Sequence, residues 1–145
     1  AYLATFAKFL IQHKEDPFCK KIIYKGMKSF VKNYIELGLK NPFMPLFIIN
    51  ELNSLGIKFV ENLLDGDKPT IEPFLTQVNT EIKAGRITPI EPIQLFMHII
   101  SLCAFPVLAK PMIMLVTQTN EKEFKALLET RKTEVTRLIL RSIKP

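Results

Sequence analysis

The feature that most constrains the fold is a stretch without Asp, Glu, Lys or Arg, which runs from Pro92 to Ala109. Its length is close to the minimum for a membrane-spanning helix. Gln94 and His98 interrupt the stretch, Pro106 is expected to break it, and no basic segment with a cleavage site is recognisable at the start of the chain. We therefore expect no membrane association and interpret the stretch as a helix that is buried on more than one side.

Composition indicates one globular, helix-rich domain spanning residues 1–145. A chain of this length buries about two thirds of its unfolded surface on folding. Hydrophobic residues make up 48% of the sequence and only 5 residues are glycine, which excludes a disordered chain and leaves no glycine-rich phosphate loop. Cys19 and Cys103 lack a CxxC spacing, so neither a zinc site nor a disulfide framework is indicated, and we expect a cytoplasmic protein.

The formal net charge of +6 raises the question of an acidic partner, because Lys and Arg neutralise phosphates. Part of the excess comes from lysines that helical spacing places on one face. These are Lys21, Lys25, Lys28 and Lys32. A phosphate-binding surface and a solvated outer face are both compatible with this stripe, and we favour the solvated face because charged helix faces usually meet water.

Helical spacing of apolar residues recurs along the whole chain, and no segment alternates as a β-strand does. The pattern over residues 2–10 begins without a capping residue, so we expect the chain to have been cut from a longer protein. Asn41 and Thr70 are predicted to cap two of the later helices. The expected helices run from Pro17 to Leu39, from Pro42 to before Gly56, from Thr70 to Gly85, from Pro92 to Phe105 and from Glu121 to Ser142. The prediction is an all-α domain of six or seven helices.

Three segments carry a resemblance to a known family. They are Asn41–Leu52, Ile82–Ile87 leading into Leu95–Pro106, and Arg131–Leu140. In their order and spacing, which cover most of the chain, they resemble the C-terminal domain of TetR-family transcription regulators.

The resemblance implies that the last two long helices pair with those of a second copy as a four-helix bundle, and that the earlier helices enclose a small molecule. Family members carry a helix-turn-helix head in front of this domain. We therefore expect the parent protein to bind operator DNA through an N-terminal domain not present in this chain. The expected role of the chain is ligand sensing and dimerisation, commonly in a repressor that its effector releases from DNA.

The residues themselves also favour a homodimer. The helix after Pro92 is apolar at nearly every phase, so it needs cover on a second face, which a second copy would supply. The alternative is that this helix lies wholly inside a monomer. The residues expected at the dimer interface are Leu95, Ile99, Leu102, Leu128, Val135 and Leu138.

Aromatic and methionine side chains that point inward on several helices are candidates for lining a pocket. The alternative for each is plain core packing. The apolar candidates are Met27, Phe30, Tyr34, Phe47, Phe74 and Met97. Asn50, Glu51 and His98 are polar groups within apolar segments, where they could orient a guest or simply satisfy a neighbouring helix. The expected effector is small and mostly hydrophobic or aromatic.

Catalytic and metal-binding patterns are not found in the sequence. The only histidines are His13 and His98, and there is no HExxH or GxSxG motif. We therefore expect no enzyme activity, no catalytic or metal site and no cofactor. The second hypothesis is a helical protein-protein interaction module that uses the apolar helix after Pro92, binds no small molecule and is a monomer when purified alone.

Overall fold

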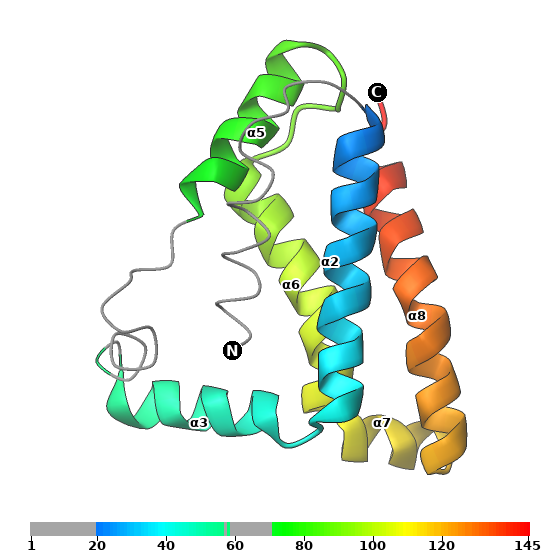
Figure 1. Ribbon diagram of the computed structural model, residues 1–145. Coiled ribbons are helices and arrows are strands. Elements are labelled where there is room, and N and C mark those ends of the chain that lie inside the picture. Colours follow the sequence, from blue (N-terminus) through cyan, green and yellow to red (C-terminus); the bar gives the residue numbers. More distant parts are fainter. Residues whose placement is uncertain (1–19, 57, 59–70) are drawn as a thin grey trace.

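The computed structural model describes residues 20–56, 58 and 71–145, and over these residues it consists of helices and their connections, without a strand (Figure 1). The helices are α2 (Lys20–Lys40), α3 (Met44–Leu55), α5 (Glu72–Lys83), α6 (Pro92–Leu108), α7 (Lys110–Thr117) and α8 (Glu121–Ser142). The all-α prediction is confirmed. The pattern expected over residues 2–10 and the expected helix start at Pro17 lie outside the described residues.

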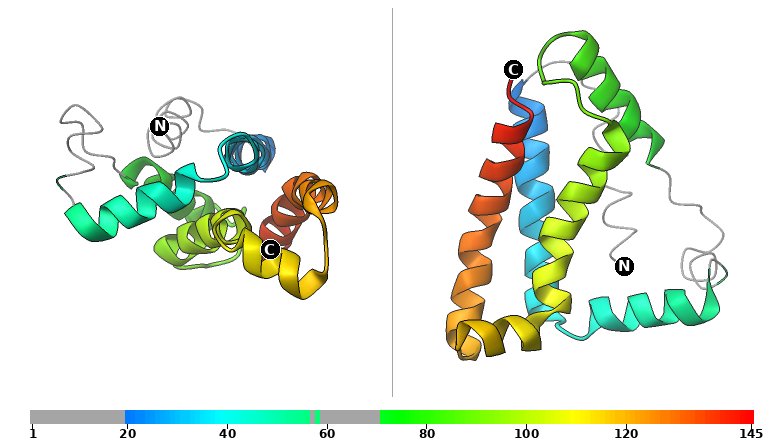
Figure 2. Two further views of the ribbon diagram at one scale, coloured as in Figure 1. Left: turned by 90° about the horizontal axis from the view of Figure 1, so that it is seen from below. Right: turned by 180° about the vertical axis from the view of Figure 1, so that it is seen from behind.

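Helices α2, α6 and α8 form a three-helix bundle that holds the core (Figures 1 and 2). The most completely buried large side chains come from all three helices, and they are Val31, Ile35, Leu95, Cys103 and Val135. Helix α7 crosses one end of the bundle and joins α6 to α8, whereas α5 lies beside the opposite end of α6 (Figure 1). Helix α3 runs across the end near α7 and extends beyond the bundle (Figure 2).

Gly38 sets the spacing between α2 and α6. A Cβ atom at this position would lie 2.7 Å from Cγ2 of Val107, which is closer than carbon atoms approach one another in proteins. The glycine is therefore needed for the close approach of the two helices and not for an unusual backbone conformation.

The ends of α6 and α8 follow from capping groups in the sequence. The Glu91 carboxylate accepts hydrogen bonds from the amides of Ile93 and Gln94, at 3.1 and 2.8 Å, at the start of α6. A capping box joins Asn120 and Glu123, whose side chains each accept from the other's backbone amide. Helix α8 accordingly has the bounds that the sequence predicts.

The expected break of α6 at Pro106 is wrong, because the helix continues through this buried proline to Leu108. A proline lacks the N–H that would bond to the carbonyl four residues earlier, here that of Leu102. The Nε atom of Arg131, on α8, donates to that carbonyl at 2.9 Å. The side chain from α8 therefore replaces the missing amide, and the replacement ties α8 to α6.

The capping prediction for Asn41 is wrong, and the one for Thr70 falls outside the described residues. The residue before α3 is Phe43 and not Asn41, and no side chain caps this helix start. Helix α5 is preceded by Ile71, again without a side-chain cap, and Thr70 lies outside the described residues. In both helices a proline in the first turn supplies the start signal, because its fixed φ suits a helix and its missing N–H costs nothing there.

Candidate functional site

Three of the predicted pocket residues belong to the bundle core. Met27 and Phe30 are buried on α2, and Tyr34 packs against the same cluster with its ring centroid 5.9 Å from that of Phe30. Burial, together with the nearby Cys103, raises the pKa of Tyr34 to about 12. These side chains act as close-packed core.

The other predicted pocket residues lie apart from this group. Phe47 and Asn50 are exposed on α3, and Glu51 is half-buried there. Met97 and His98 are exposed on α6. These positions follow from α3 turning away from the bundle and from α6 pointing its other side at the core.

Phe74, the remaining predicted pocket residue, is half-buried on α5. Its ring lies 6.1 Å from that of Phe96 on α6, in an edge-on arrangement that holds the two helices together. None of the nine predicted residues lines the cavity between α2 and α8.

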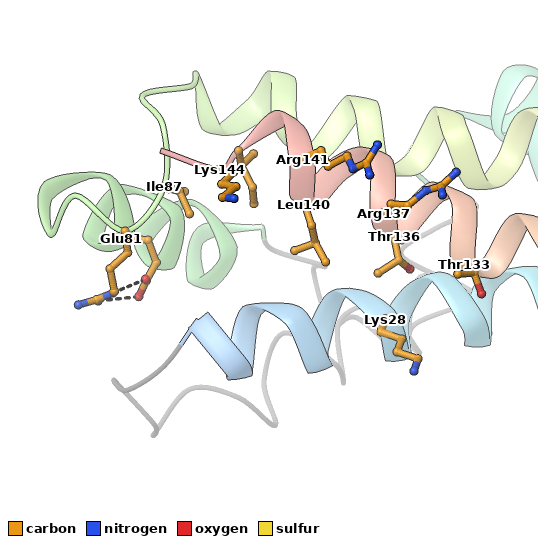
Figure 3. A pocket seen from close by; sticks show the side chains of 11 residues that line it. Lys28, Glu81, Ile87, Thr133, Thr136, Arg137, Leu140, Arg141 and Lys144 are labelled. Atoms are coloured by element: carbon orange, nitrogen blue, oxygen red, sulfur yellow. Dashed lines mark hydrogen bonds and ion pairs between the residues drawn. The ribbon is translucent and has the colours of Figure 1, made fainter.

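A half-open cavity of about 540 Å³ lies between α2 and α8, next to the connection between α5 and α6 (Figure 3). Its size suits one small molecule, since ligand pockets measure about 300–1,000 Å³. Its cationic lining residues are Lys28, Arg86, Arg137, Arg141 and Lys144. Ile87, Leu140 and Ile143 supply apolar surface, and Thr133, Thr136 and Glu81 complete the lining.

Among the described residues Glu81 is the single carboxylate that lines this cavity, and both of its oxygens are paired. Its side chain is almost completely buried, and Arg86 holds both oxygens, with Nε at 2.5 Å and Nη2 at 2.7 Å (Figure 3). Such a two-point pair compensates the burial of the charge. Glu81 therefore contributes no free negative charge to the cavity.

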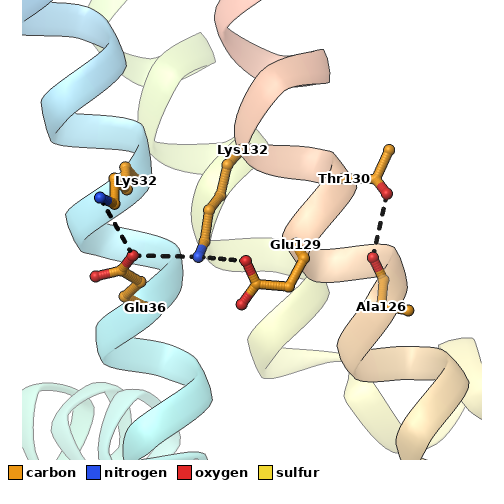
Figure 4. Close-up of polar contacts among 6 residues, drawn as sticks. All are labelled: Lys32, Glu36, Ala126, Glu129, Thr130 and Lys132. Carbon is orange, nitrogen blue, oxygen red and sulfur yellow. Dashed lines mark hydrogen bonds and ion pairs between the residues drawn. The ribbon is translucent and has the colours of Figure 1, made fainter.

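An ion network joins α2 to α8 along the seam beside the cavity (Figure 4). The Lys132 amine lies 3.2 Å from Glu36 and 2.6 Å from Glu129, and Lys32 lies 3.8 Å from Glu36. The hydrogen bond from Lys132 holds the pKa of Glu36 below its usual range. Burial works to lower the pKa of Lys132, but the hydrogen bonds with Glu129 and Glu36 outweigh it and raise that pKa.

The predicted dimer residues divide into two groups. Leu95, Ile99, Leu128 and Val135 are at most 3% exposed within a single chain, so they cannot face a second copy. This part of the prediction needs correction, and the physical reason is that these positions form the inner stripes by which α6 and α8 contact α2. Leu102 is half-buried, whereas Leu138 is 55% exposed.

The outer sides of α6 and α8 carry exposed apolar side chains that the predicted interface did not include. They are Ile93, Met97 and Phe105 on α6 and Leu127 on α8. Leu127 and Leu138 lie four residues before and seven after Arg131, on the side of α8 that reaches α6. The two leucines therefore flank the seam between α6 and α8.

The sequence contained a signal for the cavity. Arg137, Arg141 and Lys144 recur at helical spacing near the end of the chain, and Lys28 belongs to the lysine stripe of α2. What the sequence did not show is that these two basic faces adjoin.

Neither a metal site nor a single membrane-spanning helix is found in the described residues. These residues contain no group of three or more His, Cys, Asp or Glu side chains placed to hold a metal ion. Within the same residues no single helix is long and apolar enough to cross a membrane; α6 and α7 pass that test only as a pair, and they are bent by 73° relative to one another. No family model, curated protein or solved structure matches this chain.

Proposed function

We propose that this chain is the ligand-sensing and dimerisation domain of a TetR-like, DNA-binding transcription regulator. The observation that carries the proposal is the exposed apolar surface on the outer sides of α6 and α8, the last two long helices of the chain. Leu138 on α8 is 55% exposed and Phe105 on α6 is 53% exposed. Large exposed apolar side chains on neighbouring helices are typical of a protein–protein interface.

The proposed dimer pairs these two helices with the same helices of a second copy around a two-fold axis. Such an interface is self-complementary, so Leu127, Leu138 and Phe105 each contact the partner's copy of the same face. Leu102, which is half-buried at the seam, lies one turn before Phe105 and lines the edge of the interface. The bundle core stays within each subunit.

Ligand sensing is supported by the cavity between α2 and α8. A ligand changes the shape of a dimer only by binding one arrangement more tightly than another. Helix α8 forms one wall of the cavity and also carries Leu127 and Leu138, so a molecule in the cavity would contact a helix of the dimer face. The two proposed activities therefore meet on one helix.

The DNA-binding part of the proposal is tested by the coding sequence immediately upstream of Ala1 in the source gene. A helix-turn-helix pattern there would support an operator-binding parent protein and make operator mapping the next step. A start codon close to Ala1 would overturn the DNA claim and leave a free-standing helical binding domain.

The second candidate is a protein-protein interaction module without a small-molecule ligand. It is favoured by α3, where Phe43, just before the helix, is 82% exposed and Leu46 and Phe47 are also exposed. The two functions differ in response to small molecules. A sensor melts at higher temperature in the presence of some compound of a small-molecule panel, because a ligand of the folded state stabilises it. An interaction module shows no such shift.

A further inference from the structure

We infer that the cavity between α2 and α8 binds a dissolved molecule that joins one negatively charged group to an apolar tail, such as a medium-chain carboxylate. The inference rests on the proposed function in one respect, because it names the class of molecule that the chain senses. It does not depend on the dimer.

The charge of the lining points to an anion. Of the described side chains that line the cavity, five are cationic and only Glu81 is acidic. Arg86 is bound to Glu81, and Arg137 is paired with Glu134 within α8. Among the described residues no ion pair engages the remaining three cations, which are Lys28, Arg141 and Lys144. These cations give the cavity a positive potential, so a negatively charged group in it would be attracted and would lower their mutual repulsion.

The inner surface of the cavity points to an apolar tail. Ile87 and Ile143 are buried, and Leu140 points from α8 toward α2 (Figure 3). The Thr136 hydroxyl is already bound to the carbonyl of Lys132 at 2.8 Å, so it does not seek a partner in the cavity. A bare inorganic anion would leave the exposed part of Leu140 in contact with water, whereas a hydrocarbon tail would cover it.

The size and position of the cavity favour one dissolved molecule. Its volume of about 540 Å³ lies within the range of single-ligand pockets. Two hydrogen bonds of Thr88 fix the wall opposite α2. Its amide donates to the carbonyl of Ile143 at 2.9 Å, and its hydroxyl donates to the carbonyl of Lys144 at 2.6 Å. An occupant would thus contact α2, α8 and the connection before α6 at once, which are parts that a sensor would need to move together.

The first experiment titrates the purified chain with sodium decanoate by isothermal calorimetry, below the concentration at which decanoate forms micelles. Decanol keeps the tail without the charge, and acetate keeps the charge without the tail. We expect one decanoate to bind per chain, with decanol and acetate each at least about tenfold weaker. If decanol binds as tightly as decanoate, the ligand does not need a negative charge and the inference is wrong. If acetate binds as tightly as decanoate, the ligand does not need an apolar tail and the inference is also wrong.

Variants then locate the site. Lys28→Gln combined with Arg141→Gln removes two unpaired cations of the cavity, and we expect it to weaken decanoate by about tenfold or more, since bonds to charged groups are the strong ones. The matched control is Lys122→Gln combined with Lys125→Gln, which removes two exposed cations of α8 outside the cavity. Equal affinity of the two double variants would overturn the location. Both change exposed side chains, and circular dichroism checks that each is folded.

The failure of this inference and that of the proposed function can be told apart. If decanol or another uncharged compound raises the melting temperature and decanoate does not bind, the sensor survives and the anionic ligand is wrong. If no compound shifts the melting temperature and decanoate does not bind, both proposals fall. Sedimentation with phosphatidylglycerol vesicles in the absence of decanoate binding would also overturn the inference, because the partner would then be a membrane surface.

Discussion

Pro106 and Arg131 form the most informative pair of residues in the fold. The proline leaves the Leu102 carbonyl without its helical amide, and the Arg131 guanidinium supplies the replacement bond at 2.9 Å. A buried acceptor that loses its partner costs about 1–3 kcal/mol, more than most surface contacts contribute. The arginine therefore serves the structure of α6 although it belongs to α8.

This pairing predicts a conditional effect of one substitution. Arg131→Met keeps most of the apolar stem but removes the donor, so we expect it to lower the free energy of unfolding by about 1–3 kcal/mol. In the Pro106→Ala background, residue 106 has its own N–H for the Leu102 carbonyl. There we expect Arg131→Met to lower the free energy of unfolding by less than half as much. Urea denaturation of the four proteins measures both costs. Equal costs in the two backgrounds would show that the arginine acts in some other way.

Cys103 gives a second prediction at this scale. Its side chain is 0% exposed, and burial raises the pKa of its thiol to about 12, with Arg131 acting in the opposite direction. Because the thiolate is the reactive form, we expect Cys103 in a Cys19→Ser variant to react with a disulfide reagent more than about a hundredfold more slowly in the folded chain than in denaturant. Absorbance of the released thiolate measures the rate. Labelling at the same rate in both conditions would contradict its placement in the core.

The elements are held together by apolar stripes and by one ion network across the α2–α8 seam. Of the helices, α8 was predicted with its observed bounds because its capping box and its regular stripe are both local signals. The end of α6 was not predicted correctly, because its continuation through Pro106 depends on Arg131, which lies far along the chain. Helix α7 was not predicted as a separate helix, although Pro111 in its first turn is the same start signal that opens α3 and α5.

The ion network predicts a pH dependence with a defined sign. The pKa of Glu36 is lowered in the folded chain, so its pairing stabilises the fold above the usual carboxylate range and is lost as the pH falls through the lowered pKa. The pKa of Lys132 is raised, so its contribution is present below the usual amine range and is lost only as the pH rises through the raised pKa. The network stabilises the fold between these limits.

We therefore expect Glu36→Gln to lower the melting temperature at pH 7, and this effect to shrink as the pH falls through the lowered pKa of the wild-type carboxyl. Glu134→Gln is the control, because Glu134 pairs with Arg137 inside α8 and joins no two helices. Thermal unfolding followed by circular dichroism measures the difference at each pH. A Glu36→Gln effect that persists unchanged at pH 3 would show that the charge of Glu36 is not what matters.

At the scale of the whole molecule, the sequence predicted the all-α class. It was less informative about which individual residues form a site. Periodicity shows that Leu95 and Leu138 lie on apolar stripes, but it does not show which stripe faces the chain's own core and which faces outward. That choice depends on where α2 lies, and α2 covers Leu95 and leaves Leu138 exposed. The cavity was missed for the same reason, since Lys28 and Arg141 line one cavity only because α2 packs against α8.

The measurement that tests the account most directly is the molar mass of the purified chain by light scattering over a range of concentrations. The chain has a mass of 16.7 kDa, and we predict twice that value for the wild type. Leu138→Lys should return the mass to that of a monomer, because it places a charge on the proposed interface of α6 and α8. Leu55→Lys is the control, since Leu55 is as exposed but lies on α3. A wild-type mass of 16.7 kDa at every concentration, or a dimer that Leu138→Lys leaves intact and Leu55→Lys dissociates, would contradict the account.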